Sequence, residues 1–129
     1  GDGYPTLAAL QQAAALAAGG DRRGAIAIYD GLAQTAEGEL LQGLARLLGA
    51  LSALDGAAEG EVERRLEPLL GGQGPWRHSA REVAALAAQQ GGRLDAARKL
   101  FTELADDATA PAGIRARAAE MQAALGGAS

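Results

Sequence analysis

The side chains best suited to acid–base chemistry lie around His78, the only histidine in the sequence. Glu82 follows it by four residues, so on a helix it would lie one turn further on and could orient the imidazole of a general base. Covalent catalysis also needs a nucleophile within reach of that base, and Ser79, adjacent in sequence, points elsewhere on a helix. We therefore expect no catalytic residue and no enzymatic activity.

The sequence gives equally little support for a metal site or a phosphate site. One histidine without a cluster of aspartates does not make a metal site, and the chain has no cysteine. The pair Asp106-Asp107 is more simply explained as a helix end followed by a solvated turn. Gly19-Gly20 precedes a helix but lacks the strand before it and the lysine after it that a phosphate-binding loop needs. We expect no metal-binding residue, no cofactor-binding residue and no cofactor.

Trp76 and Arg77 are better candidates for contact with another protein. Tryptophan and arginine are both enriched at the centres of protein interfaces. The alternative is that Trp76 packs as a hydrophobic staple over the start of its own helix and the end of the previous hairpin. We favour the staple and keep the two residues as an alternative partner contact.

Composition narrows the class of protein. A chain of 129 residues fits one domain with a real core, and with aromatics at only 3% that core must be alanine and leucine. The net charge of -4 comes without a basic stripe, which argues against nucleic acid as a partner. No apolar run approaches the ~20 residues of a membrane span, and no signal peptide is visible. An anchoring segment, if the protein has one, would precede Gly1.

Apolar stripes at helical spacing, separated by glycine and proline, predict an all-α protein of seven helices. Thr6 is expected to cap a helix over 7–18, and Asp21 is expected to cap the next one. A third helix is expected over about 39–54 and a fourth over about 59–70. Nothing alternates with period two for long enough to indicate a strand.

The second half of the chain predicts a helical hairpin most clearly. Pro75 suits the first turn of a helix, where a missing N–H costs nothing. Gly91-Gly92 ends that helix, and the next stripe begins at Leu94. A link this short allows the two helices to pack only antiparallel to each other. The whole chain is then expected to form hairpins over about 6–35, 39–70 and 75–106, with a capping helix over about 111–125.

An internal repeat indicates how these hairpins stack. Gly20, Gly56 and Gly92 are spaced 36 residues apart. Two such steps relate Tyr29 to Phe101, each preceded by a small residue and followed by a leucine, so we expect these aromatics in equivalent positions between hairpins. Three hairpins and a closing helix predict a short α-solenoid, in which each repeat buries its face against its neighbours.

The middle copy of the repeat is degenerate. Glu61 and Arg65 occupy the positions of the small and the aromatic residue. The register there is expected to shift, because Val62, Leu66 and Leu69 still form an apolar stripe. Pro68 falls in the last turn of this helix and weakens it.

In a solenoid the first helices of the hairpins line a concave groove. The groove would be small, mostly apolar and lightly charged, which suits a peptide or an unfolded segment of another protein. The structural alternative is a dimerisation or docking domain that uses a leftover apolar face, such as that of the third helix, so self-association is also open. The expected lining consists of Leu10, Ala14, Arg46, Ala50, Glu82, Leu86 and Gln89.

The order of glycine, small residue and aromatic residue resembles the tetratricopeptide repeat, although the usual tryptophan and tyrosine of its first helix are absent. PWRHSARE, ARKLFTELADDATAP and IRARAAEM, between Pro75 and Leu125, are similar to the C-terminal half of the YfgM-like ancillary subunits of the Sec translocon. That resemblance implies an N-terminal membrane anchor and a position on the periplasmic face of the bacterial inner membrane. It also implies translocon components, exported chains and periplasmic chaperones as partners.

Overall fold

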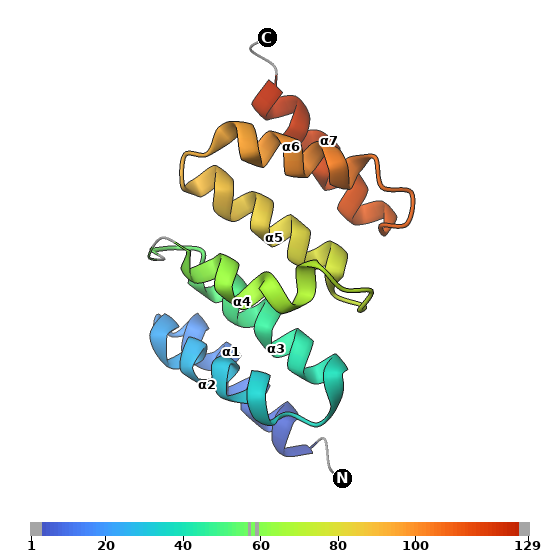
Figure 1. Cartoon of the computed structure of the whole chain (residues 1–129). Coiled ribbons are helices and arrows are strands. Elements are labelled where there is room, and N and C mark those ends of the chain that lie inside the picture. Colours follow the sequence, from blue (N-terminus) through green and yellow to red (C-terminus); the bar gives the residue numbers. More distant parts are fainter. Residues whose placement is uncertain (1–3, 57, 59, 127–129) are drawn as a thin grey trace. The chain divides into compact units, whose positions relative to one another are not determined.

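The computed structural model describes residues 4–56, 58 and 60–126, and within them it contains seven helices and no strand (Figure 1). The all-α prediction is therefore confirmed. Successive helices within residues 4–53 pack as helical hairpins, as do those within 77–126, which is the packing of a short α-solenoid. The helices are α1 (Tyr4–Ala18), α2 (Arg22–Thr35), α3 (Gly38–Ala53), α4 (Glu61–Leu70), α5 (Arg77–Gln90), α6 (Leu94–Ala105) and α7 (Ala112–Gly126).

The chain divides into two compact units. The N-terminal unit is Gly1–Leu66 and the C-terminal unit is Glu67–Ser129, so the boundary falls inside α4. The single domain expected from the chain length stays a prediction.

The N-terminal unit is built on α2, which packs against both α1 and α3. Its core joins Ala13 of α1 to Ala25 and Tyr29 of α2, and Leu48 of α3 packs against them. Alanine at the first two positions lets α1 and α2 approach closely, and the ring of Tyr29 fills the space that remains. Tyr29 is only 5% exposed, as an aromatic residue between hairpins should be.

The C-terminal unit repeats this plan with α5, α6 and α7. Phe101 of α6 is 1% exposed and packs among Ala85 and Ala88 of α5 and Ile114 and Ala118 of α7. Tyr29 and Phe101 therefore occupy equivalent places, each on a central helix between the helices before and after it. This confirms the prediction drawn from the repeat.

The repeat is also visible in the backbone. Gly20, Gly56 and Gly92 have positive φ angles of 93°, 75° and 79°, which side chains with a Cβ rarely adopt. After the first of these glycines the N–H of Asp21 donates to the carbonyl of Leu16 over 2.8 Å, and 72 residues later the N–H of Arg93 donates to that of Ala88 over 2.9 Å. Both bonds close the same helix-ending motif.

The middle repeat is shifted in register, as expected. Val62 and Leu66 are 2% and 0% exposed, so they take the buried stripe of α4. Glu61 is buried beside this stripe, and Arg65 is half-buried. Pro68 lies in the last turn of α4, where it removes little of the helix.

Several helix ends differ from the prediction. Thr6 is not the cap of α1, because the helix begins at Tyr4 and Thr6 lies buried in its first turn. Pro75 does not lie in α5, which begins at Arg77 after a turn. The cap predicted at Asp21 is confirmed, since its side chain accepts from the N–H of Gly24 over 2.9 Å.

Candidate functional site

The four predicted groove residues of the N-terminal unit differ in exposure. Ala14 is exposed on α1, and Leu10 and Arg46 are half-buried. Leu10 packs against the core around Tyr29. Ala50 has no exposed surface, so it belongs to the interior and its assignment to an open lining is wrong. In the sequence, a position that lines a groove and a position in the core recur at the same helical spacing. Only the packing of the folded chain tells which of the two Ala50 occupies.

The three predicted groove residues of the C-terminal unit share one face of α5. Glu82, Leu86 and Gln89 are all half-buried, and Leu86 packs against the core around Phe101. Glu82 is already paired: Arg117 of α7 donates to both of its oxygens, over 2.8 Å from Nε and 3.0 Å from Nη2. This bidentate pair links α7 to α5. Its arginine is 59% exposed, so it adds little stability.

His78 lies in a polar cluster with partners that sequence reasoning did not name. Its side chain is 7% exposed, and Nδ1 lies 3.6 Å from the Oδ2 atom of Asp107. Its other ring nitrogen, Nε2, lies 3.4 Å from the hydroxyl oxygen of Thr109, in the loop between α6 and α7. Arg81 donates to the carboxylate of Asp107 over 2.8 Å. The cluster ties the first turn of α5 to that loop.

The electrostatics of this cluster are set by Asp107. Its carboxylate accepts from the hydroxyl of Thr109 over 2.6 Å and from its backbone N–H over 2.9 Å. The Thr109 hydroxyl and then the Arg81 guanidinium hold the pKa of Asp107 well below its usual range. Asp107 is therefore a paired carboxylate rather than the solvated end of a helix.

Trp76 and Arg77 lie at the start of α5. Trp76 is half-buried and is the N-cap residue, and its carbonyl accepts from the N–H of Ala80 over 2.8 Å. Arg77 folds back on the preceding turn, where Nη1 donates to the carbonyls of Gln73 and Gly74 over 3.3 and 3.1 Å. The partner contact proposed for these two residues stays a prediction.

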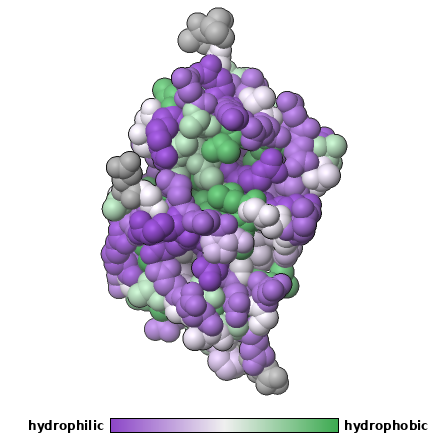
Figure 2. Space-filling view, viewed as in Figure 1, coloured by the Kyte–Doolittle hydropathy of each residue, from purple (hydrophilic) through white to green (hydrophobic). Residues whose placement is uncertain are grey.

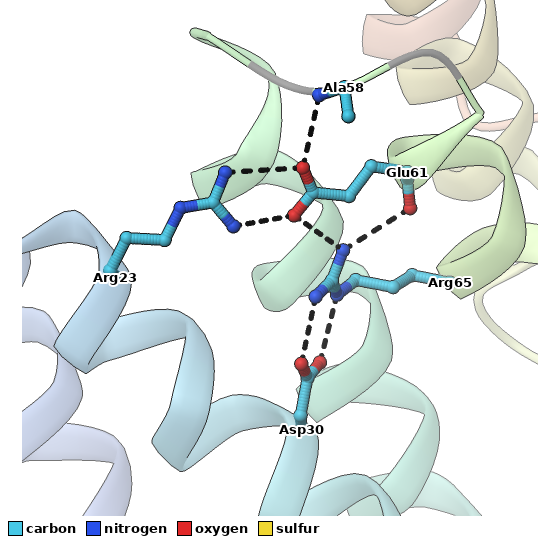
Figure 3. A network of polar contacts seen from close by, with 5 residues as sticks. All are labelled: Arg23, Asp30, Ala58, Glu61 and Arg65. Atoms are coloured by element: carbon cyan, nitrogen blue, oxygen red, sulfur yellow. Dashed lines mark hydrogen bonds and ion pairs between the residues drawn. The ribbon is translucent and has the colours of Figure 1, made fainter.

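The strongest polar site in the N-terminal unit is a network of four charged side chains (Figure 3). At its centre is Glu61, which is only 5% exposed. Arg23 of α2 donates to both carboxylate oxygens, over 2.7 Å to Oε2 and 3.2 Å to Oε1. The N–H of Ala58 donates to Oε1 over 3.2 Å, and Arg65 donates to Oε2 over 3.1 Å. A buried carboxylate with four donors is fully satisfied.

Arg65 links Glu61 to a second carboxylate. It binds Asp30 of α2 in a bidentate fork, with 2.8 Å between Nε and Oδ1 and 2.8 Å between Nη2 and Oδ2. Gly49 of α3 lies beside this ion pair, where an added Cβ would be in ordinary van der Waals contact with Asp30 and Arg65 at 3.5 and 3.6 Å. The two positive charges of the arginines therefore neutralise the two negative charges of the carboxylates, and each helix contributes one of each sign.

The network shifts the ionisation of its members. The hydrogen bond from Arg23 lowers the pKa of Glu61 to about 2, against the opposing effect of burial. The bond to Asp30 raises the pKa of Arg65 above its ordinary value. Glu61 and the two arginines are thus charged at neutral pH.

Sequence reasoning found only half of this network. Glu61 and Arg65 stood out because they break the repeat, but Arg23 and Asp30 are 38 and 35 residues earlier in the chain. Arginine and aspartate on the outside of α2 look like ordinary solvated charges. A signal was available in hindsight, because two charges on α4 in core positions need partners of opposite sign.

No metal cluster is found in the part of the chain that the structure describes, where no three side chains of histidine, aspartate or glutamate come together as ligands. Within that same part, none of the helices has the length and apolar character needed to cross a membrane.

Large apolar side chains remain on the surface. Figure 2 shows one face, on which hydrophilic residues predominate and apolar residues form smaller patches between them. Two exposed leucines, Leu40 and Leu51, lie on α3, and Leu44 between them is half-buried. The residues with the largest exposed apolar side chains are Leu7, Leu40, Leu51 and Leu94.

Comparisons with protein-family models, with curated proteins and with solved structures found no match to this chain. The fold and its side chains define the class of protein, an all-α chain of stacked helical hairpins. The tetratricopeptide and translocon resemblances stay hypotheses.

Proposed function

We propose that this chain is a non-enzymatic protein-interaction module. The observation that carries the proposal is the leucine stripe of α3, which we define as Leu40, Leu44 and Leu51. Steps of four and seven residues put all three on one face of the helix, and the first and last are 56% and 41% exposed. Exposed apolar side chains in a row are suited to an apolar segment of another protein, such as an amphipathic helix or an unfolded chain.

The predicted groove residues stay candidates within each unit. In the N-terminal unit Ala14 of α1 is exposed, and Leu10 and Arg46 are half-buried. In the C-terminal unit Leu86 and Gln89 of α5 are half-buried, and Leu86 packs partly on the core around Phe101. Such a surface would bind weakly, because few of its side chains are both apolar and fully accessible.

The resemblance in sequence supports a finer proposal about place and partners. It would make the chain the soluble domain of a membrane-anchored protein at the periplasmic face of the bacterial inner membrane. Its partners would be exported chains, translocon components or periplasmic chaperones. This part rests on Pro75–Leu125, whereas the leucine stripe lies in the N-terminal unit, so the two parts can be tested separately.

A second candidate function uses the same leucine stripe. If two copies of the chain cover each other's α3, the protein is a dimerisation or docking domain with no peptide site. The exposed leucines favour this alternative as directly as they favour a foreign partner, and only the oligomeric state separates the two.

The test replaces the two exposed leucines together, as Leu40→Glu with Leu51→Glu. The matched control is Leu94→Glu on α6, where the leucine is 48% exposed but stands outside the stripe. Leu10 and Leu86 are unsuitable, because a glutamate at either would disturb a core as well as a surface. We would measure binding of a permanently unfolded secreted protein by fluorescence anisotropy, and oligomeric state by sedimentation over a hundredfold range of concentration.

For a binding module, we expect a monomeric parent whose affinity for the unfolded chain falls at least tenfold in the stripe variant and is unchanged in the control. For a dimerisation domain, the parent is a dimer and the stripe variant a monomer. Equal binding and equal oligomeric state in all three proteins would overturn both candidates.

A further inference from the structure

The internal repeat gives the chain two helices that are close copies of one another. A step of 72 residues carries Ala25 and Tyr29 of α2 onto Ala97 and Phe101 of α6, with buried side chains in both. The helix-ending motifs before α2 and α6 also agree bond for bond. During folding, α4 therefore meets two similar helices, and only one of them can be its correct partner.

The two copies differ in the charges they would offer to α4. On α2 those charges are Arg23 and Asp30, and both are bound in the network of Figure 3. The same 72-residue step puts Asp95 and Thr102 at the equivalent positions of α6. The arginine is thus replaced by a residue of opposite charge, and the aspartate by a neutral one.

These differences matter because the side chain of Glu61 is only 7% exposed and that of Arg65 only 18% exposed. Opposite Asp95, the carboxylate of Glu61 would meet a like charge in place of an arginine. Opposite Thr102, the guanidinium of Arg65 would lose its bidentate partner. A buried charge without a partner is strongly unfavourable, so docking of α4 on the wrong copy is penalised far more than docking on the right copy is rewarded.

We propose that the network of Arg23, Asp30, Glu61 and Arg65 is a pairing code that directs α4 to α2 and not to α6. The code explains why the middle repeat abandons the small and aromatic residues of its neighbours. Apolar residues at these positions would pack equally well on either copy. Buried ions are best known for fixing register rather than for adding stability.

The test reverses the charges of the network in two halves, in the full chain. One variant reverses the α2 half, as Arg23→Glu with Asp30→Arg. Another reverses the α4 half, as Glu61→Arg with Arg65→Glu. The third carries all four substitutions and so restores every pair with opposite sign. The readout is hydrogen exchange of the amides of α4, with those of α1 and α5 to α7 as internal references in each protein.

We expect either half-reversal to speed exchange in α4 at least tenfold while α6 and α7 keep their protection. The fourfold variant should return to within about threefold of the parent, because the pairing is restored although no original residue remains. The matched control is Lys99→Glu with Glu103→Lys, which reverses two exposed charges on α6 without giving that helix the charges of Arg23 and Asp30, and it should leave exchange in α4 unchanged.

Three results would overturn the proposal. Unchanged exchange in both half-reversals would mean that the network does not direct docking. A fourfold variant no better protected than its halves would mean that the original side chains act through shape and not through charge pairing. A control that disturbs α4 as much as the half-reversals would mean that charge changes on any helix have the same effect.

Discussion

At the scale of single residues, the side chain with the least ordinary environment is the carboxylate of Glu61. It is almost fully buried, yet it remains charged because two arginines and a backbone N–H donate to it. One of these arginines, Arg23, lies on α2 and precedes Glu61 by 38 residues. The residue therefore acts as a long-range contact, although in the sequence it looks like one acid in a charged helix.

The first prediction concerns the acid sensitivity of this contact. The pKa of Glu61 is lowered from 4.5 to about 2 in the folded chain, so its stabilisation is fully present above pH 4.5 and is lost as the pH falls toward 2. Glu61→Gln removes the charge and should cost about 1–3 kcal/mol at pH 7, because the arginines lose their charged acceptor. The difference in unfolding free energy between parent and variant should shrink steadily between pH 4.5 and pH 2.

Urea titrations at a series of pH values would measure that difference. Glu37→Gln is the matched control, because Glu37 is exposed and its side chain makes no capping bond. A difference that stays constant down to pH 2 would contradict the assignment of a charged Glu61 to the folded state.

At the scale of elements, the helix ends are set by glycines that the sequence alone identifies. Gly92 ends α5 with a φ of 79°, a conformation that costs an L-residue about 1–2 kcal/mol. Gly31 lies inside α2, where an added Cβ would meet nothing within 4 Å. The same chemical change should therefore have opposite effects at the two positions.

The second prediction compares Gly92→Ala with Gly31→Ala. The former should lower the free energy of unfolding by about 1 kcal/mol, because alanine strains the turn. The latter should raise it by about 0.5–1 kcal/mol, because alanine restricts the unfolded chain and suits a helix interior. Thermal and urea unfolding of both variants would measure this, and effects of the same sign would show that the turn tolerates a side chain.

At the scale of the whole molecule, each of the two compact units has a core around one aromatic ring. One surrounds Tyr29 in the N-terminal unit and the other surrounds Phe101 in the C-terminal unit. Each core takes its residues from three successive helices. A small chain with so few aromatics depends heavily on the one large ring in each core.

The third prediction is that Phe101→Ala costs about 3–5 kcal/mol, because it leaves a cavity among the helices of the C-terminal unit. Hydrogen exchange should accelerate in α5, α6 and α7 more than in α1, α2 and α3. Leu94→Ala, on the exposed side of the same helix, should change stability by less than about 0.5 kcal/mol. If the two variants melt together, the packing of Phe101 seen here is wrong.

The sequence by itself determined the helices, their approximate ends and the repeat. Those features depend on residues within one or two turns of each other: Gly92 closes a helix wherever it stands, and Tyr29 follows Ala25 at helical spacing. The shifted register of the middle repeat was also predictable, because Val62 and Leu66 form a stripe on their own. Errors at Thr6 and Pro75 are shifts of about two residues, which local patterns do not resolve.

Only the tertiary structure decided which side chains face each other. Ala14 and Ala50 are the same residue type, and both fall at helical spacing on the predicted groove face. Ala50 is nevertheless fully buried and Ala14 is exposed, because their neighbours come from different helices. The partners of Glu61 and of His78 lie 38 and about thirty residues away in the chain. Ion pairs at that separation depend on how α2 meets α4 and how α5 meets the loop before α7. A single sequence records the charges but not the distances between them, and the energy of a charge depends on those distances and on burial.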